Sequence, residues 1–570
     1  MSTYPKIDDN KFNSKIYKKF KKYEIPKDNG TINKYCKPKK LQLQLPQKFV
    51  SNFINPSTPY KGLLVYHRIG SGKTCTAIQV AEKWKKLRKI VVVLPASLKG
   101  NFRNELRSQH CGQDIYLTNK ERNTLMKTNP KDKIFKDIIK KSDERIDKVY
   151  TIYSYNKFVD LALDSKIKLK KTLLIIDEVQ NMISETGIYY SQLKDLIDNA
   201  DSSFRIILLS ATPIFDKPFE IALTMNLLKL PNELPIGREF ENTFIGKKKN
   251  ELFTKNMDLF KKYIKGYVSY YKGSPDYTFP KLKIKYVNCK MSNFQYTAYK
   301  SVFKNEHKGS KKLSKKIINV SELPNNFFIG TRFASNIVFP NKLVDDKGFE
   351  SFKEKEIIKR LEKYSTKFNK IIKQLKKKGK SFVYSSFKEL AGIKSLVKVL
   401  EAHGYKNYLK HGMGKKRFAI WSSDENILVK EEIREVFNRK NNLYGENLKI
   451  ILGSPSIKEG VSLKAVKYVH ILEPYWNNSR IEQVIGRASR FCSHIDLPKE
   501  ERIVNINIYI SVYENDKNTV DNYIKIMSNN KNKIIKSFEK SLKEVAVDCK
   551  LNKNANKNII NKLDIIKCDN

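Results

Sequence analysis

A short glycine-rich string, GSGKT (Gly70 to Thr74), most constrains what this chain can fold into. It follows the apolar run GLLVYH (62–67) and precedes TCTAIQVAEKW, whose apolar spacing predicts a helix. Glycines in such a strand-to-helix turn let backbone N–H groups close around phosphate oxygens, and the lysine reaches the β- and γ-phosphates. The string therefore predicts an α/β domain with a nucleoside triphosphate at the N-terminus of that helix.

The predicted phosphate loop includes the residues on both sides of the glycines. Thr74 is expected to ligate Mg²⁺, and Lys73 to contact the phosphates. The strict pattern has a further glycine at position 67, where this chain has His67. A chance glycine-rich turn is the alternative, and the flanking strand and helix argue against it. The residues predicted to bind the nucleotide are His67, Arg68, Ile69, Gly70, Ser71, Gly72, Lys73 and Thr74.

Two carboxylates end a later apolar run, TLLIID (172–177). Parallel strands of α/β sheets bind ligands at their carboxyl ends, which is where Asp177 and Glu178 would lie. Asp177 is predicted to hold Mg²⁺, and Glu178 to orient and deprotonate the attacking water. In isolation, Asp177 and Glu178 could equally well be an acidic pair that caps a helix. The presence of GSGKT upstream argues against that alternative.

Two further groups complete a series of motifs. Gln180, Ser210, Ala211 and Thr212 (the last three spelling SAT) are predicted to couple the nucleotide site to the rest of the protein, although SAT alone equally fits a helix cap. In QVIGRASR (483–490), helical spacing places Gln483, Arg487 and Arg490 on one face. Arginines supplied from a second domain would stabilise charge on the γ-phosphoryl group. A solvated basic helix face is the alternative, and the intervening apolar residues argue against it.

Apolar runs predict two doubly wound parallel sheets of the α/β class. Strands are expected at 62–67, 90–95, 150–155, 172–177 and 205–210, and again at 381–386, 448–453, 468–473 and 504–510. The predicted boundaries are 1–40 for an N-terminal extension, 41–230 for the ATP-binding domain, 231–354 for a mainly helical insertion, 355–515 for the second domain and 516–570 for a helical tail.

Composition bears on the partners of the protein. The formal net charge of +52 favours a polyanion, with nucleic acid considered before an anionic membrane surface. An AT-biased coding sequence would also enrich lysine, so the charge supports nucleic-acid binding without proving it.

The cysteines and the first residues bear on the compartment. Seven scattered cysteines show no CxxC pair and no zinc-type histidine spacing, which predicts free thiols in a reducing compartment. With no signal-peptide pattern and no apolar run long enough for a bilayer, a soluble intracellular protein is expected.

The order of these motifs resembles that of superfamily 2 helicases. More narrowly, the chain resembles the poxvirus and giant-virus nucleoside triphosphate phosphohydrolase I and early transcription factor small subunit group. The relaxed phosphate loop at His67 agrees with a motor rather than a small GTPase or kinase-like fold. The segments that carry the narrower resemblance, within a likeness covering about residues 41–550, are PASLKGNF (95–102), SATPIFDKPFEIALTMNLL (210–228), TRFASNIVFP (331–340) and EGVSLKAVKYVHILEPYWNNSRIEQVIGRASRFCSH (459–494).

The resemblance implies further roles, by position. Gln47 matches an adenine-reading glutamine, and Glu459 with Gly460 matches a loop that contacts nucleotide and strand. Residues 384–387 match the start of a nucleic-acid face, while Gln180 stands where many relatives have His or Asp. The implied cofactors are ATP and Mg²⁺, and the implied partners are DNA or RNA and a viral RNA polymerase or transcription-factor subunit, without a membrane. The implied setting is the virion and the host cytoplasm, in a virus factory.

Three hypotheses follow. The first is an ATP-driven helicase or translocase acting in viral transcription. The second is a promoter- or polymerase-bound early transcription factor subunit that uses ATP as an assembly switch. The third is a packaging protein with a vestigial ATPase, which intact Lys73, Asp177, Glu178 and Arg487 argue against. The sequence does not choose between the first two, nor between DNA and RNA, unwinding and translocation alone, or the two directions of travel.

Overall fold

The computed structural model describes most of the chain. The described residues are 4–28, 30–37, 42–68, 70–129, 132–248, 251–308, 328–458, 461–514, 518–557 and 566–569. They form two compact units: residues 1–275 together with 533–570, and residues 276–532.

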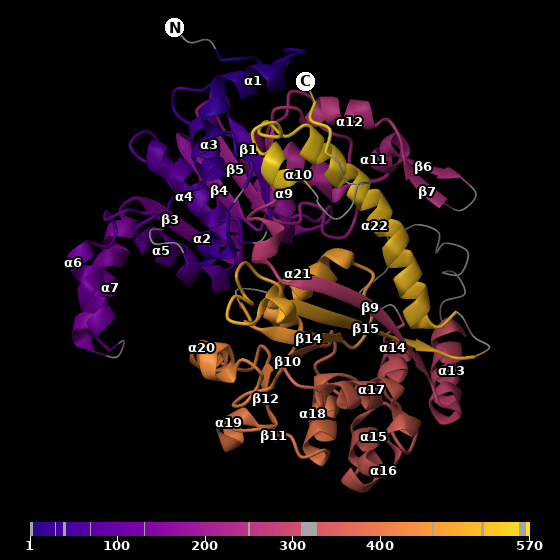
Figure 1. The fold of residues 1–570 in the computed structure, drawn as a ribbon. Coiled ribbons are helices and arrows are strands. Elements are labelled where there is room, and N and C mark those ends of the chain that lie inside the picture. The colour runs from indigo at the N-terminus through magenta and orange to yellow at the C-terminus, as the bar shows by residue number, and fades with distance from the viewer. Residues whose placement is uncertain are drawn as a thin grey trace. The chain divides into compact units, whose positions relative to one another are not determined.

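The first unit is built on a parallel sheet of six strands in the order β3-β2-β4-β5-β1-β8 (Figure 1). Its central strands are buried along their whole length because helices cover both faces, which explains their unbroken Val, Ile and Leu runs. The strands are β1 (Gly62–His67), β2 (Lys89–Leu94), β3 (Tyr150–Ser154), β4 (Thr172–Asp177), β5 (Arg205–Ser210) and β8 (Val268–Tyr271), and a separate antiparallel pair is β6 (Ile245–Lys248) and β7 (Glu251–Thr254).

The helices of the first unit lie between these strands in the chain and before them. They are α1 (Phe12–Phe20), α2 (Ile32–Cys36), α3 (Leu45–Phe53), α4 (Lys73–Trp84), α5 (Lys99–Arg107), α6 (Asn119–Lys127), α7 (Lys133–Asp147), α8 (Tyr155–Leu163), α9 (Ile188–Asp198), α10 (Glu220–Asn226), α11 (Gly237–Phe244), α12 (Met257–Ile264) and, from the end of the chain, α23 (Lys553–Asn556).

The second unit holds a seven-stranded parallel sheet in the order β11-β12-β13-β10-β14-β15-β9. Its strands are β9 (Lys281–Lys290), β10 (Lys380–Tyr384), β11 (Lys406–Asn407), β12 (Arg417–Trp421), β13 (Ile450–Gly453), β14 (Val466–Ile471) and β15 (Ile503–Val512). Its helices are α13 (Asn293–Lys308), α14 (Ile329–Asn336), α15 (Asp346–Ser351), α16 (Glu354–Tyr364), α17 (Thr366–Leu375), α18 (Ile393–Ala402), α19 (Tyr408–His411), α20 (Ile427–Asn438) and α21 (Asn478–Ala488), and α22 (Val520–Glu544) begins there.

The predicted fold class is confirmed, since two parallel α/β sheets occur in tandem and all nine predicted strands are present. Among the described residues, four strands of the two parallel sheets were not predicted, namely β8, β9, β11 and β12, and neither was the pair β6 and β7. Strand β9 reads KLKIKYVNCK, and most of its side chains are exposed, so it lacks the buried apolar run that marks a central strand. Residues 231–354 thus contribute helices and also one strand to each sheet.

The end of the chain returns to the first unit and joins its core. Phe538, in the C-terminal half of α22, packs at 5.2 Å from Phe240 and 5.1 Å from Phe260, measured between ring centroids. Leu542 and Val545 are fully buried in the same core. From residue 533 onward, the predicted tail is therefore part of the nucleotide-binding unit, whereas the start of α22 belongs to the second unit.

The cysteines differ from the prediction of free thiols. Cys75 is bonded to Cys111, and Cys549 to Cys568, while Cys289 is free and buried. The prediction is wrong for these two pairs because their partners lie 36 and 19 residues apart in sequence and meet only in the fold.

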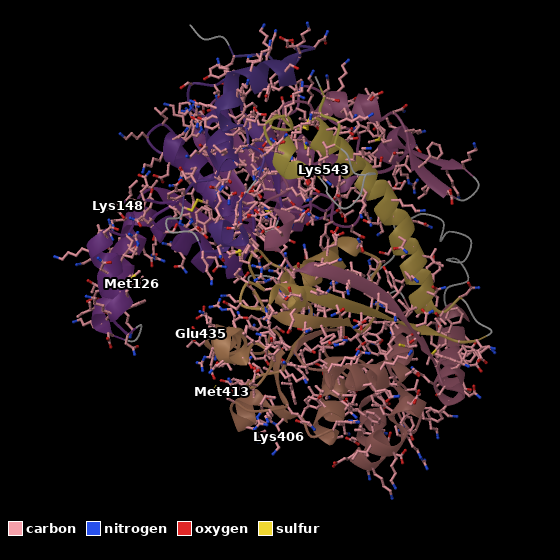
Figure 2. All side chains as sticks on the ribbon, in the orientation of Figure 1. Met126, Lys148, Lys406, Met413, Glu435 and Lys543 are labelled. Atoms are coloured by element: carbon pink, nitrogen blue, oxygen red, sulfur yellow. A yellow bond between two sulfur atoms is a disulfide. The ribbon has the colours of Figure 1, made fainter. Side chains whose placement is uncertain are left out.

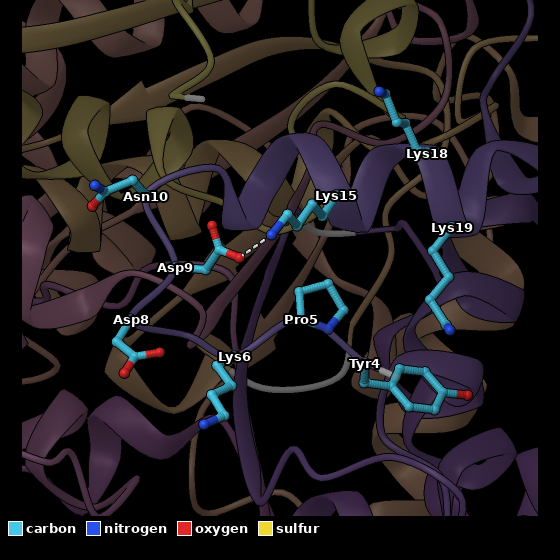
Figure 3. A pocket seen from close by; sticks show the side chains of 9 residues that line it. All are labelled: Tyr4, Pro5, Lys6, Asp8, Asp9, Asn10, Lys15, Lys18 and Lys19. Atoms are coloured by element: carbon cyan, nitrogen blue, oxygen red, sulfur yellow. Dashed lines mark hydrogen bonds and ion pairs between the residues drawn. The ribbon is translucent and has the colours of Figure 1, made fainter. Parts of the chain in front are cut away.

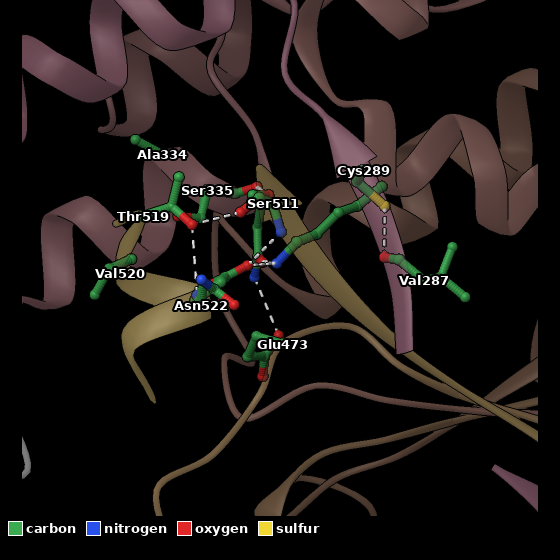
Figure 4. Close-up of polar contacts among 12 residues, drawn as sticks. Val287, Cys289, Ala334, Ser335, Glu473, Ser511, Thr519, Val520 and Asn522 are labelled. Atoms are coloured by element: carbon green, nitrogen blue, oxygen red, sulfur yellow. Dashed lines mark hydrogen bonds and ion pairs between the residues drawn. The ribbon is translucent and has the colours of Figure 1, made fainter. Parts of the chain in front are cut away.

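A buried ion pair belongs to a polar network in the second unit. Lys367 on α17 and Asp521 on α22 are 0% and 1% exposed, and Lys367 Nζ lies 2.6 Å from Asp521 Oδ2. Figure 4 labels Glu473 and Ser511 of this network. Lys367 also donates to Asn336 Oδ1 at 2.9 Å, and Asn336 donates to Glu473 Oε2 at 3.1 Å. Asp521 accepts the backbone N–H of Ser511 at 2.8 Å. Two segments that carried the family resemblance, around 331–340 and 459–494, therefore meet in one polar network.

The exterior carries much of the lysine excess. Lys148 and Lys406 project into solvent (Figure 2). Lys543 instead lies over the rings of Tyr66 and Tyr270, at 5.7 and 5.4 Å from the ring centroids. Within the described ranges, no helix combines the length and the apolar character needed to cross a membrane.

Candidate ATP site

The phosphate loop connects β1 to α4, as the sequence predicts. Gly70 and Gly72 have φ of 82° and 78°, a left-handed conformation that suits glycine. A Cβ on Gly72 would lie 2.5 Å from Gln47 Nε2, so the close approach of α3 also requires glycine there. Lys73 and Thr74 then form the first turn of α4, where backbone N–H groups are free to bind an anion.

One further observation indicates that a phosphate group fits the loop. The Ser71 hydroxyl is fully buried and has no hydrogen-bond partner among the described residues. A buried hydroxyl normally finds a partner, so an oxygen-rich ligand at the loop would satisfy it. The residues present therefore suit a nucleoside triphosphate.

Gln47, predicted to read the adenine, is engaged within the protein. Its Nε2 donates to Gly72 O at 3.2 Å, and its Oε1 accepts the backbone N–H of Gln44 at 2.8 Å. These two bonds tie the start of α3 to the phosphate loop. The role in base recognition stays a prediction.

His67 is anchored by residues that the sequence did not indicate. Its Nε2 lies 2.9 Å from Ser269 Oγ, and Ser269 donates to Asp548 Oδ2 at 2.6 Å. All three side chains are fully buried. Because Ser269 uses its proton toward Asp548, His67 donates from Nε2. Burial, with a smaller effect of Lys73, lowers the pKa of His67 to about 3, and burial raises the pKa of Asp548 to about 7.

The acidic pair faces the loop lysine. Lys73 Nζ lies 4.0 Å from Glu178 Oε1, and Glu178 adopts φ of 52° directly after β4. Asp177 is 6% exposed, and burial together with the charge of Glu178 raises its pKa to about 7, while Lys73 opposes the rise. Tyr155, which the sequence did not indicate, donates to the carbonyls of Asp177 at 2.5 Å and of Glu178 at 3.0 Å.

A chain of hydrogen bonds runs from the acidic pair to the SAT segment. Gln180 Nε2 donates to Glu178 Oε2 at 2.7 Å, and Gln180 Oε1 accepts from Ser210 Oγ at 2.7 Å. Ser210 Oγ in turn accepts the backbone N–H of Thr212 at 3.0 Å, and Ala211 lies between them. The geometry thus connects the predicted catalytic carboxylate to the predicted coupling segment.

The predicted arginines belong to the second unit. Gln483 and Arg487 lie on α21, and the Arg487 side chain is largely buried. The prediction that Arg490 shares their helix face is wrong, because α21 ends at Ala488. Arg490 follows that end and donates from Nε to Gly486 O at 3.3 Å.

Three predicted residues, Ile69, Glu459 and Gly460, lie outside the described residues. A surface pocket at the N-terminal segment contains none of the predicted ATP-site residues (Figure 3). It is lined by Tyr4, Pro5, Lys6, Asp8, Asp9, Asn10, Lys15, Lys18 and Lys19, with an ion pair between Asp9 and Lys15.

Tandem RecA-like folds, with a phosphate loop and an acidic pair in the first, define an ATP-dependent nucleic-acid motor as the class of protein. Residues 35–215 match the family model "Type III restriction enzyme, res subunit", and residues 366–492 match "Helicase conserved C-terminal domain". The chain belongs to the superfamily 2 helicases, in a viral ATP-dependent helicase family, and is an ATP-hydrolysing enzyme.

Two viral relatives agree with this assignment. "Putative ATP-dependent RNA helicase R563" of Acanthamoeba polyphaga mimivirus is 52% identical over 97% of each chain. "Termination factor NPH-I homolog" of African swine fever virus is 26% identical and covers 94% of this chain and 83% of its own. Among solved structures, the Pyrococcus furiosus Hef helicase domain matches at 15% identity with a TM-score of 0.43, over 85% of this chain and 97% of that domain.

Proposed function

We propose that this motor moves along nucleic acid during viral transcription, with Mg²⁺-dependent ATP hydrolysis as its energy source. One observation carries the proposal: the hydrogen-bond chain from Glu178 through Gln180 to Ser210. A switch that only binds ATP needs no link between the carboxylate that activates water and the SAT segment, whereas a motor must transmit each hydrolysis event.

The geometry of the site supports a proposed role for each of these residues. Thr74 and Asp177 would hold Mg²⁺, which supplies charge neutralisation between the β- and γ-phosphates when bound. Glu178 would accept a proton from the attacking water, and Lys73 would hold the γ-phosphate. We assign Arg487 and Arg490 to stabilisation of transition-state charge on the basis of their motif.

The transcription setting rests on the relatives. A relative named as a termination factor supports a role alongside a viral RNA polymerase, and a virion and cytoplasmic factory location follows from the same proposal. The alternative, an early transcription factor subunit with ATP as an assembly switch, shares the whole ATP site.

A displacement experiment separates the two. Hydrolysis is measured with and without single- and double-stranded DNA and RNA, beside displacement of streptavidin from a biotinylated strand end. A motor gives hydrolysis that rises severalfold with one nucleic acid and ATP-dependent displacement, and Lys73→Ala loses both. Hydrolysis that no nucleic acid stimulates, with promoter or polymerase binding that needs only ATP binding, would favour the switch.

A further inference from the structure

Three metal-ligating side chains meet in the first unit, beside the helix that follows the phosphate loop. The ligand atoms of Cys75, His110 and Cys111 all lie within 4.8 Å of one another. Cys75 directly follows Thr74 on α4, whereas His110 and Cys111 lie in the turn after α5. A fourth donor is adjacent, since Glu105 Oε2 lies 3.3 Å from Cys111 Sγ and 3.8 Å from His110 Nε2.

The surrounding backbone holds this cluster in place. Gln79 on α4 donates to Cys111 O at 2.6 Å, and the backbone N–H of Cys111 donates to Ser108 Oγ at 3.3 Å. A Cβ on Gly112 would lie 1.7 Å from Leu106 O, so the tight turn requires glycine at that position. The turn that presents His110 and Cys111 is therefore fixed against both α4 and α5.

Glu105 remains available as a ligand because the arginines near it on α5 pair with other carboxylates. Its two arginine neighbours on α5 are engaged elsewhere, because Arg107 pairs with Asp143 and Arg103 with Asp143 and Asp147.

We propose that, when Cys75 and Cys111 are reduced, their thiolates bind one Zn²⁺ together with His110 and Glu105. Two sulfurs, one imidazole nitrogen and one carboxylate oxygen form a tetrahedral donor set of the kind that zinc takes in proteins. The two cysteines are buried, whereas the side chains of His110 and Glu105 are 28% and 42% exposed, which gives the ion a path from solvent.

The disulfide between Cys75 and Cys111 is the oxidised alternative to this site. A dithiol reductant transfers two electrons and two protons to the disulfide, which gives two thiols, and is itself converted to a disulfide. Zn²⁺ then displaces the two thiol protons as it binds the sulfurs. Zinc would join the first turn of the phosphate-loop helix to the turn after α5, and oxidation would replace that metal link with a covalent one.

The test uses the full chain, reduced and freed of metal under argon. Titration with Zn²⁺ is expected to reach one equivalent with release of two protons from the thiols, and the same protein with Co²⁺ should show thiolate-to-cobalt charge transfer and tetrahedral ligand-field bands. The reduced protein should also melt at a higher temperature with zinc than with a chelator. Oxidised protein should bind neither metal at this site.

Substitutions test whether these residues bind the zinc ion. Cys111→Ser should no longer bind one equivalent of zinc and should lose the charge-transfer band, and Glu105→Gln should bind zinc more weakly than the parent because it lacks the carboxylate ligand. His110→Ala, at a half-exposed position that should not disturb folding, serves as the second ligand test. Cys289→Ser, a change at a cysteine outside the cluster, should bind zinc like the parent. Reduced parent protein that binds no zinc, or Cys111→Ser and His110→Ala proteins that bind it like the parent, would overturn the proposal.

Discussion

Gln180 donates a hydrogen bond to Glu178 at 2.7 Å while it accepts one from Ser210 at 2.7 Å, so one amide side chain links two motifs. Gln180 and Ser210 are 6% and 0% exposed, and bonds of this kind are stronger away from water. The relative timing of hydrolysis and movement in this motor should depend on this amide.

Gln180→Ala should lower ATP turnover by about 10- to 100-fold, because a hydrogen bond to a charged carboxylate contributes roughly 1.5–3 kcal/mol. ATP affinity should change little, since Gln180 does not belong to the phosphate loop. Turnover and nucleotide affinity are measured with and without nucleic acid, beside Asn181→Ala, a change at an exposed neighbour. Parental turnover in Gln180→Ala would show that the link is structural only.

Asp177→Asn should stabilise the nucleotide-free protein at neutral pH. The folded protein holds the Asp177 proton up to about pH 7, whereas the unfolded chain loses it near pH 4. Ionisation of the unfolded chain therefore lowers stability as the pH rises through that window. The asparagine variant should be more stable than the parent at pH 7.5, by an amount on the order of a few kcal/mol, and the gain should vanish toward pH 4.

Urea unfolding without Mg²⁺ at a series of pH values measures this difference. Asp160→Asn, at an exposed aspartate of the same unit, is the matched control variant. A stability difference for Asp177→Asn that is the same at pH 4 and pH 7.5 would contradict a raised pKa for Asp177.

Ser269→Ala should weaken both the fold and ATP binding. The change leaves the His67 N–H and the Asp548 carboxyl without their shared partner, which costs about 1–3 kcal/mol for a buried polar group. Because His67 begins the phosphate loop, the KM for ATP should rise more than kcat falls. Ser274→Ala, a change at another buried serine in the same unit, is the matched control. Unchanged KM with lowered stability would limit Ser269 to a structural role.

Lys367→Met should destabilise the second unit by about 3–5 kcal/mol, because Asp521 would remain buried without its partner. The double change Lys367→Met with Asp521→Leu should recover most of the loss, since apolar residues can replace a buried ion pair. Denaturant unfolding measures both, with Lys359→Met as an exposed control. A double variant as unstable as the single one would mean that Asn336 and Ser511, and not the ion pair, dominate the network.

Arg487→Ala should lower ATP turnover far more than ATP affinity, by about 10³ to 10⁵ if it acts as an arginine finger. Arg490→Ala is expected to act in the same direction. Arg487→Lys should rescue poorly, because lysine lacks the planar fork of donors. Steady-state hydrolysis with saturating nucleic acid is compared with nucleotide affinity. Normal turnover in both alanine variants would remove the two arginines from the reaction.

Local patterns predicted most of the sheet strands and the phosphate loop. A buried parallel strand such as β4 needs apolar residues on both faces, so a run of consecutive apolar residues predicts it. The motif GSGKT needs a strand before it and a helix after it, and both are also recognisable in the neighbouring sequence. The exposed strand β9 and the end of α21 before Arg490 could not be predicted in this way. An edge strand lacks the apolar run, and a helix end depends on packing beyond the motif.

The sequence by itself determined the family, the tandem α/β fold and the residues expected to hold ATP. Only the tertiary structure brought Asp548 to Ser269 and His67, and Cys111 to Cys75, since these partners are far apart in the chain. The physical reason is that hydrophobic burial of the C-terminal helix and of the turn after α5 sets where these polar groups lie. Packing of that kind depends on many distant side chains together, and no short motif records it.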